Sequence, residues 1–200
     1  MRASRIIDFG GRRQHEIHIG GIFASGEPAV VRTVLGSCVA VCLRDPRSQI
    51  GGMNHFMLPQ GGSDDLVSAR YGVHAMELLI NDCMKLGADR RRFEAKVFGG
   101  GHVLQMRESD GNVPQRNIMF ALQFLDTENI PIVARDLGGY AAREVLFFTD
   151  SGRILLKRLQ KTGSDTSRVI VEALDKEERA GLRMVHAAQP AEADANVTLF

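Results

Sequence analysis

Two cysteines and one histidine lie close enough along the chain to form a reactive site. Cys38 and Cys42 stand four residues apart in the stretch VLGSCVAVCLRDP, and His55 follows in GGMNHFMLP. A cysteine in such a setting can be a buried packing residue, one half of a metal or redox site, or a nucleophile activated by a histidine. The elements that position Cys38 and His55 distinguish these roles.

The segment between the two motifs predicts a hairpin that brings Cys38 to His55. It contains Asp-Pro, which initiates turns, so the β-type segments 39–43 and 50–58 are expected to pair antiparallel. If residues 45–48 form the turn, Cys38 lies directly opposite His55. Opposed residues of an antiparallel pair share one face, with Cβ atoms about 4.5–5.5 Å apart, whereas a one-residue slip would put them on opposite faces.

A thiol beside an imidazole is the arrangement that makes a cysteine nucleophilic. The pKa of a free cysteine is about 8.5, and a neighbouring imidazolium favours the thiolate. The small residues Gly36 and Ser37 precede Cys38 and allow backbone N–H groups to converge near the sulfur, where an oxyanion could form. The pattern therefore predicts Cys38 as nucleophile, His55 as its partner, and the backbone at Gly36 and Ser37 as an oxyanion site.

The spacing of the residues gives less support to a disulfide, a metal site or a redox role for these cysteines. Residues four apart on a strand are separated by about 13 Å, too far for a disulfide between Cys38 and Cys42. A zinc site from Cys38, Cys42 and His55 would lack a fourth ligand, and the chain has no Cys-x-x-Cys motif for redox chemistry. Cys42 in mid-strand and Cys83 on the apolar stripe of a helix are interpreted as packing residues, and no metal or organic cofactor is expected.

Strand and helix signals alternate along the chain and predict a single domain of the α+β or mixed α/β class. Strands are expected at 29–35, 39–43, 50–58, EAKVFG, IPIVARDL and the hairpin REVLFFT-DSG-RILLKRL. Helices are expected at 69–87 and 115–129, where apolar residues recur at helical spacing. Many strands with local hairpins and two good helices are the basis of this prediction.

The two ends of the chain differ in composition from its middle. Residues 1–20 are polar and are interpreted as a loosely held lead-in, in which His15 and His18 are two exposed histidines rather than a metal pair. The domain is expected to span 21–162. Residues 163–200 form a C-terminal extension with one short helix at 169–183 and a disordered end.

Composition excludes several classes of function. The 44% hydrophobic and 24% charged residues are typical of a globular protein, and the net charge of +1 gives no indication of nucleic-acid binding. The run Arg90–Arg92 is interpreted as a solvated surface. No stretch approaches the roughly 18–20 apolar residues needed to cross a bilayer, so no direct membrane insertion is expected. The absence of a signal-like segment and the odd set of three cysteines favour the reducing cytoplasm.

The motifs around the two candidate residues resemble the CheD family, the chemoreceptor glutamine deamidases of bacterial chemotaxis. TVLGSCVAVCLRDP and GGMNHFMLP carry the resemblance, and it continues through YGVHAMELLINDCMKLGADRRRFEAKVFGGG, RNIMFALQFL and IPIVARDLGGYAAREVLFFTDSGRILLKRL. It covers roughly residues 28–158. The chain departs from the family pattern at Gly101-His102 and at Val113-Pro114-Gln115, which could alter the rim of the site.

The resemblance implies a cysteine-dependent hydrolase that converts selected glutamine side chains of chemoreceptors to glutamate with release of ammonia, and that also accepts glutamyl methyl esters. It implies a mixed β-sandwich with flanking helices, similar to the cytotoxic necrotizing factor deamidases. It maps the family's catalytic cysteine to Cys38, its histidine to His55, and the threonine of its triad to Thr33. The implied partners are the cytoplasmic helices of chemoreceptors.

The alternative is a binding module without catalysis. Such a protein would act as a chemotaxis adaptor that docks on receptor helices or on a CheC-type phosphatase. The two hypotheses differ in the chemistry of Cys38, because an activated thiolate reacts with iodoacetamide near neutral pH much faster than a buried packing cysteine.

Overall fold

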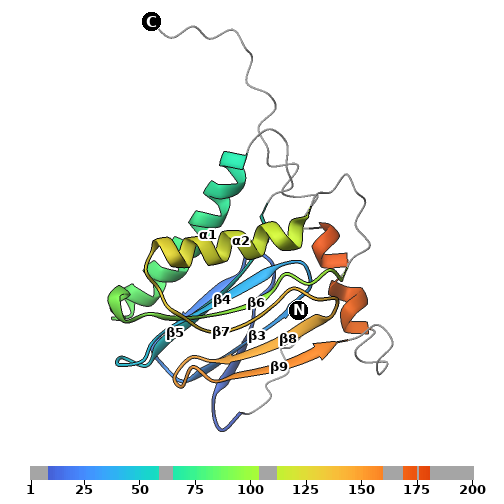
Figure 1. The fold of residues 1–200 in the computed structure, drawn as a ribbon. Coiled ribbons are helices and arrows are strands. Elements are labelled where there is room, and N and C mark those ends of the chain that lie inside the picture. The colour runs from blue at the N-terminus through green and yellow to red at the C-terminus, as the bar shows by residue number, and fades with distance from the viewer. Residues whose placement is uncertain (1–8, 59–64, 104–111, 160–168, 175, 181–200) are drawn as a thin grey trace, which may run out of the picture.

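The computed structural model describes residues 9–58, 65–103, 112–159, 169–174 and 176–180, which form one α+β domain with two mixed sheets (Figure 1). The four-stranded sheet has the order β1-β3-β8-β9, and the five-stranded sheet has the order β2-β5-β4-β6-β7. The strands are β1 Arg13–Glu16, β2 Ile22–Ser25, β3 Ala29–Leu35, β4 Val39–Asp45, β5 Ile50–Phe56, β6 Glu94–Gly99, β7 Ile132–Leu137, β8 Ala142–Phe148 and β9 Ile154–Leu159. Both sheets are mixed because β1 pairs parallel with β3, and β6 pairs parallel with β7.

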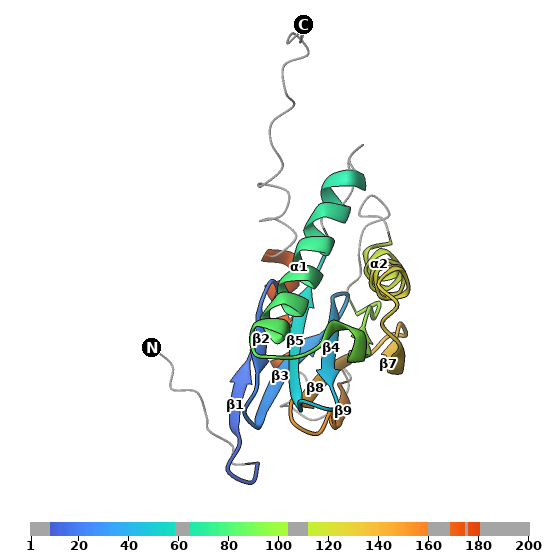
Figure 2. The same cartoon turned by 90° about the vertical axis from the view of Figure 1, so that its left-hand side faces the viewer.

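The two sheets pack face to face, and the helices cover the outer face of the larger one. The inter-sheet cluster contains Val31 and Val145 from one sheet and Ala40 and Met53 from the other. A second cluster lies between the five-stranded sheet and the helices α1, Asp65–Lys85, and α2, Val113–Thr127. Figures 1 and 2 show both helices on the same side of the sheets. The five-stranded sheet is therefore buried on both faces, which explains why most residues of β4 and β5 are apolar or small.

The observed helices differ from the expected ones chiefly at their ends. α1 begins four residues before the expected 69–87 and ends two residues before it, and α2 lies two residues earlier than 115–129. Pro114 stands in the first turn of α2, where its missing N–H costs nothing, and Asn112 caps the helix. On α1 the expected apolar stripe is buried at Met76, Ile80 and Cys83 but exposed at its ends.

The strands expected from sequence are all present, and two further short strands precede them. β1 pairs with β3, and β2 pairs with β5. Thus residues 13–16, which lie in the segment interpreted as a lead-in, belong to the four-stranded sheet. Four-residue strands with a mixed polar sequence carry little periodicity, and β1 is placed by its neighbour β3 rather than by its own pattern.

The hairpin β4–β5 forms as expected, but its register differs from the prediction. The turn comprises residues 46–49, so that Asp45 pairs with Ile50 and Ala40 pairs with His55. Gln49 adopts a φ of 59° and donates its N–H to the Asp45 carbonyl oxygen at 2.9 Å. The expected direct opposition of Cys38 and His55 is therefore wrong. Because the error is two positions in the pairing, Cys38 stays on the same face as His55, one pleat further along.

The run Arg90–Arg92 is an ion-pair cluster rather than a solvated surface. These residues form a short 3-10 helix, η1, after α1. Arg90 pairs with Glu77 and Glu128, Arg91 pairs with Asp89, and Arg92 pairs with Asp89 and with the fully buried carboxylate of Asp45. The cluster ties η1 to the β4–β5 turn and thereby helps to fix the hairpin that carries His55.

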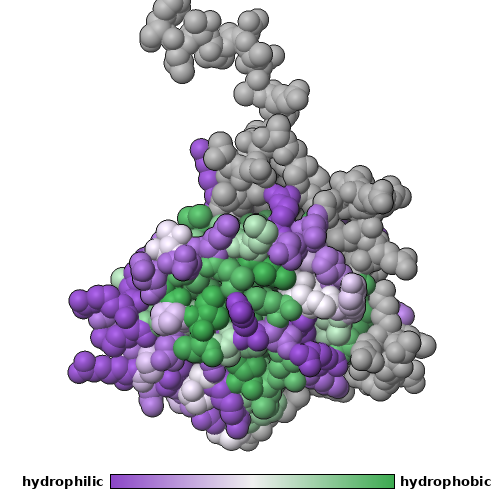
Figure 3. All heavy atoms as spheres, viewed as in Figure 1, coloured by the Kyte–Doolittle hydropathy of each residue, from purple (hydrophilic) through white to green (hydrophobic). Residues whose placement is uncertain are grey.

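One face of the molecule exposes several apolar side chains, as Figure 3 shows. Met119 of α2 and Val133 of β7 are about half exposed, and Tyr140 just beyond β7 is almost fully exposed. β7 is an edge strand of its sheet, and a groove beside it is lined by Leu122, Ile130 and Ile132, among others. None of the helices in the described ranges has the length and apolarity that a membrane span requires.

Candidate active site

Thr33 and His55 meet between the two sheets. Thr33 lies on β3 and His55 on β5, both almost fully buried, and Thr33 Oγ1 is 2.8 Å from His55 Nδ1. The Thr33 hydroxyl also donates to the Ile17 carbonyl oxygen at 2.9 Å. Because a hydroxyl has only one proton, it must accept from Nδ1–H. His55 is therefore the Nδ1–H tautomer, and its Nε2 carries the lone pair of a base.

His55 Nε2 is buried and has no hydrogen-bond partner among the described residues. Burial lowers the pKa of His55 to about 3, and the charge of His18 acts in the same direction. The imidazole is thus neutral at physiological pH. The imidazolium expected from the sequence is not the resting form, and His55 can accept a proton rather than stabilise a thiolate as a cation.

The turn before β4 is held through its carbonyl groups. The Cys38 carbonyl oxygen accepts from Gly100 N–H at 2.7 Å, and the Gly36 carbonyl oxygen accepts from Gly101 N–H at 2.6 Å. The Ser37 carbonyl oxygen accepts from the side chain of Asn117 on α2 at 2.9 Å. These bonds fix the backbone of the turn, and the N–H groups of Ser37 and Cys38 converge on one point, where both donate to the same oxygen atom. This is the backbone geometry of an anion-binding nest.

Two parts of this support were not anticipated as site residues. Asn117 is fully buried and also accepts from Leu58 N–H at 2.8 Å, so it links the Cys38 turn to the end of β5. Gly99 adopts a φ of +112°, and a Cβ at this position would lie 2.1 Å from the Cys38 carbonyl oxygen. A buried asparagine in an otherwise apolar helix face and a run of three glycines after a strand were the signals in the sequence.

Cys38 is fully buried within the inter-sheet cluster. Burial raises the pKa of its thiol well above the usual value, and the carboxylate of Glu178 raises it further through its charge and a hydrogen bond. Since Ala40 is the residue paired with His55, Cys38 is the diagonal neighbour of His55 on the same face of the sheet. In this state the site holds a protonated thiol and a neutral imidazole.

Glu178, from the C-terminal part of the chain, fills the nest. Its Oε1 accepts from Ser37 N–H at 2.7 Å and from Cys38 N–H at 3.2 Å, and its side chain is fully buried. The sequence assigned this residue to the short helix of an extension and gave it no role. An acidic residue in a polar segment has no pattern that would reveal such a long-range contact.

The remaining candidates are placed apart from this site. Cys42 packs between the sheets and Cys83 packs between sheet and helices, and burial raises the pKa of both thiols. The His15 ring stacks on Phe23, with ring centroids 4.0 Å apart, while His18 lies 3.3 Å from the Glu177 carboxylate. Within the described ranges, no group of three or more His, Cys, Asp or Glu side chains is arranged to hold a metal ion.

The burial of neutral His55 predicts a pH-dependent stability. Between about pH 6.5 and pH 3 the unfolded chain binds a proton at this residue that the folded chain does not, so stability falls as the pH falls through this window. From pH 7 to pH 5 the wild type should lose about 2 kcal/mol more unfolding free energy than His55→Gln. Urea titrations of both proteins at the two pH values measure this difference, and equal losses would contradict a buried, neutral His55.

Comparison with known proteins places the chain among bacterial chemotaxis proteins. Residues 57–158 match the family model described as CheD, chemotactic sensory transduction. The relatives bear the name probable chemoreceptor glutamine deamidase CheD. The CheD 1 protein of Dechloromonas aromatica is 55% identical over 149 residues, covering 74% of each chain.

Two further relatives show the same level of identity. The protein of Bordetella petrii is 54% identical over 138 residues, covering 68% of this chain and 61% of the relative. The protein of Stenotrophomonas maltophilia strain K279a is 54% identical over 133 residues, covering 66% of this chain and 67% of the relative. With a family model that matches half of its length and relatives this similar, the chain belongs to the CheD family.

Proposed function

We propose that this protein is a chemoreceptor glutamine deamidase, which converts selected glutamine side chains of chemoreceptors to glutamate and releases ammonia. The relatives named for this activity support it, because more than half of the aligned residues are identical, over 74% and 68% of this chain. The receptor segments that it would modify are the cytoplasmic helices, which places the proposed reaction in the cytoplasm.

The observation that carries the proposal is the nest beside Cys38. Two backbone N–H groups, from Ser37 and Cys38, converge on one carboxylate oxygen next to the thiol. An oxyanion formed by attack on an amide needs this arrangement of donors, and such donors stabilise charge strongly in a site without water. The close approach is possible because Gly36 has no side chain: a Cβ there would lie 2.8 Å from the bound oxygen.

The proposed reaction uses the side chains of Cys38, His55 and Thr33. His55 Nε2 takes the thiol proton as the sulfur of Cys38 attacks the glutamine amide carbon, and the N–H groups of Ser37 and Cys38 hold the oxyanion. The protonated His55 then gives its proton to the leaving ammonia. Next, His55 deprotonates the water that hydrolyses the thioester. Thr33 fixes the ring and its tautomer throughout.

Two finer features belong to the same proposal. A glutamyl methyl ester needs the same steps with methanol as leaving group, so methylesterase activity requires no further residue. The architecture is proposed to be a variant of the β-sandwich of cytotoxic necrotizing factor deamidases. Two packed mixed sheets with helices on one outer face support this.

The experiment that tests the proposal is mass spectrometry of a receptor cytoplasmic fragment incubated with the protein. We expect peptide mapping to find glutamate at specific glutamine positions, with one ammonia released for each. A non-catalytic adaptor, which docks on receptors or on a CheC-type phosphatase, is the competing function. It predicts binding of the fragment with no mass change at any glutamine, and that outcome would overturn the deamidase proposal.

Thr33 is proposed as a positioning residue, and its replacement should slow the reaction without abolishing it. Thr33→Val removes the hydroxyl that lies 2.8 Å from His55 Nδ1 and leaves the Ile17 carbonyl group as the remaining partner of the ring. We expect kcat to fall about 10–100-fold, because the imidazole is held less firmly in its orientation. Thr33→Ser keeps the hydroxyl and should restore most of kcat. Equal kcat values for the valine and serine variants, with unchanged pH profiles, would show that the hydroxyl has no such role.

A further inference from the structure

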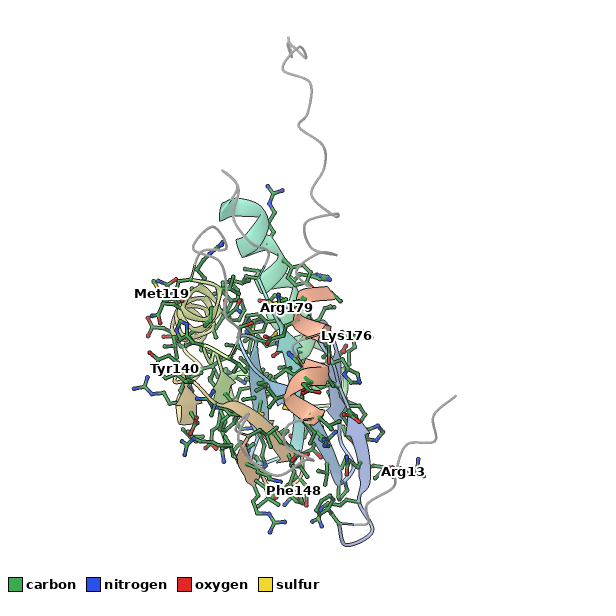
Figure 4. The ribbon with its side chains drawn as sticks, turned by 90° about the vertical axis from the view of Figure 1, so that its right-hand side faces the viewer. Arg13, Met119, Tyr140, Phe148, Lys176 and Arg179 are labelled. Carbon is green, nitrogen blue, oxygen red and sulfur yellow. The ribbon has the colours of Figure 1, made fainter. Side chains whose placement is uncertain are left out.

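The helical residues 169–174 and 176–180 lie across the candidate active site. Val171 and Leu174 are buried in a small cluster with Val103, Ala142 and Leu159. Glu177 accepts from Ile19 N–H at 3.1 Å and lies beside His18. Figure 4 shows this segment in front of strands of the sheets, with Lys176 and Arg179 labelled along it. The segment thus covers the end of the fold at which β4 begins.

Glu178 of this segment occupies the position that a reacting side chain would need. Its carboxylate lies in the nest of Ser37 and Cys38 N–H groups and against the Cys38 thiol. Its second oxygen, Oε2, is buried and has no hydrogen-bond partner among the described residues. A purely structural carboxylate would be expected to satisfy both oxygens. In a glutamine side chain whose oxygen is held by the same two N–H groups, the amide nitrogen takes the place of Oε2.

The chemical identity of the side chain that occupies the nest, a glutamate, is informative. A glutamate side chain is the product of glutamine deamidation, so Glu178 presents to the nest the group that the reaction would leave there. Burial raises the pKa of Glu178 despite the hydrogen bonds it accepts. The same burial keeps the Cys38 thiol protonated and out of contact with solvent. A site filled in this way can neither bind a substrate side chain nor react.

Among the described residues, few buried apolar side chains anchor the segment, and this favours its displacement. Its apolar cluster is separate from the two main cores and contains only two buried residues of the segment, Val171 and Leu174, among the described residues. A cavity of about 210 Å³ lies between the segment and β1 and β3, lined by Ile170, Ala173 and Arg32 among others. The ion pair of Glu177 with His18 is exposed and contributes little.

We propose that this helical segment occupies the groove in which the substrate helix docks, with Glu178 as a tethered product in the place of the target glutamine. This inference rests on the proposed deamidase function. The substrate that this proposal describes is an amphipathic helix with apolar residues seven and four positions before the target glutamine. Val171 and Leu174 have these two positions relative to Glu178. Substrate must displace the segment, so the segment acts as a built-in competitive inhibitor.

The direct test converts the tethered product into a tethered substrate. In full-length Glu178→Gln, the Cys38 sulfur can bond to the carbon of the introduced side-chain amide, the C–N bond breaks, and ammonia leaves with a proton. Water then hydrolyses the thioester to glutamate and the free thiol. We expect intact-mass measurement and peptide mapping to show that position 178 returns to glutamate, at a rate independent of protein concentration. A stalled thioester, seen as the loss of one ammonia, would support the same placement.

Two matched variants control this test. Cys38→Ala combined with Glu178→Gln should keep the introduced glutamine, because no nucleophile remains. Glu177→Gln should keep its glutamine with Cys38 intact, because that side chain contacts His18 and Ile19 rather than the nest. Persistence of the amide at position 178 in a Glu178→Gln protein that deamidates a receptor fragment would overturn the inference and leave the proposed function standing. Absence of conversion in both the receptor fragment and position 178 would overturn both.

A second test measures the inhibition itself. In Glu178→Ala we expect Cys38 to react with iodoacetamide about tenfold faster or more, since two hydrogen bonds to a charged group no longer hold the segment. The KM for a receptor fragment should fall with little change in kcat. Lys176→Ala, on the exposed side of the segment, should behave as the wild type. Unchanged alkylation and unchanged KM in Glu178→Ala would show that the segment does not compete with substrate.

Discussion

Replacing Cys38 by alanine is expected to reduce glutamine conversion at least about ten-thousandfold, because the reaction then has no nucleophile. The fold should persist, since Cys38 is one small member of a large inter-sheet cluster. The measurement is the initial rate of glutamate formation in a receptor fragment, with circular dichroism to verify the fold. Retention of more than a small fraction of the wild-type rate would contradict a covalent mechanism at Cys38.

Cys42 provides the matched control for this prediction. It lies on β4, four residues after Cys38 and in the same cluster, but its neighbours are packing residues and burial raises the pKa of its thiol. Cys42→Ala should cost about 1 kcal/mol of unfolding free energy through lost packing and leave the rate of conversion close to that of the wild type. A loss of activity as large as that of Cys38→Ala would show that any cavity in this cluster disables the site.

Asp45 is expected to have the largest effect on stability. Its carboxylate is fully buried at the start of the β4–β5 turn and accepts from the Arg92 guanidinium and from the N–H groups of Arg47, Ser48 and Asp89. Asp45→Ala should lower the unfolding free energy by about 3–5 kcal/mol, because buried donors and one side of an ion pair lose their partner. Denaturant titration near neutral pH measures this change.

In the wild-type protein, acid should remove the contribution that the Asp45 carboxylate makes to the unfolding free energy. The hydrogen bond from Arg92 holds the pKa of Asp45 well below its usual range, so its stabilisation is present above about pH 4 and is lost as the pH falls further.

Asp82, which is partly exposed and pairs with Lys85 one turn later, provides the control for Asp45→Ala. Asp82→Ala should change stability by less than about 0.5 kcal/mol. Similar losses of unfolding free energy in Asp45→Ala and Asp82→Ala would show that the Asp45 network is not specifically important.

The fold could be predicted from the sequence to the extent that its elements carry a pattern. β3, β4, β5 and the β8–β9 hairpin have strong β-type segments bounded by turn residues, and the structure contains all of them. β1 and β2 are only four residues long, β1 is polar as well, and both form because neighbouring strands offer an edge. No local pattern encodes such pairing, so these strands could not be predicted.

The register error in the hairpin has a local physical cause. Asp-Pro marks the turn, but the placement of its four residues depends on Gln49 at a positive φ and on the bonds that Asp45 makes to the turn. Glutamine is not a residue that indicates a left-handed conformation. The face of Cys38 and His55 was nevertheless predicted correctly, because an error of two in the pairing preserves the alternation of side chains.

The parts of the site that were missed come from long-range contacts. Asn117 and Glu178 reach the Cys38 turn from 80 and 140 or more residues further along the chain. Their residue types are ordinary for a helix, and only the folded chain brings them to Ser37. Thr33 and His55, which the family resemblance assigned to one triad, lie on strands of different sheets with 2.8 Å between Oγ1 and Nδ1.

The most direct test of the central claim is to trap the thioester at Cys38. A receptor fragment is incubated with the protein in the presence of hydroxylamine, which competes with water for a thioester but not for an intact amide under these mild conditions. The proposed mechanism predicts a hydroxamate, alongside glutamate, at each modified glutamine, and neither product with Cys38→Ala. Glutamate alone at every hydroxylamine concentration, with no thioester in rapidly quenched protein, would contradict it.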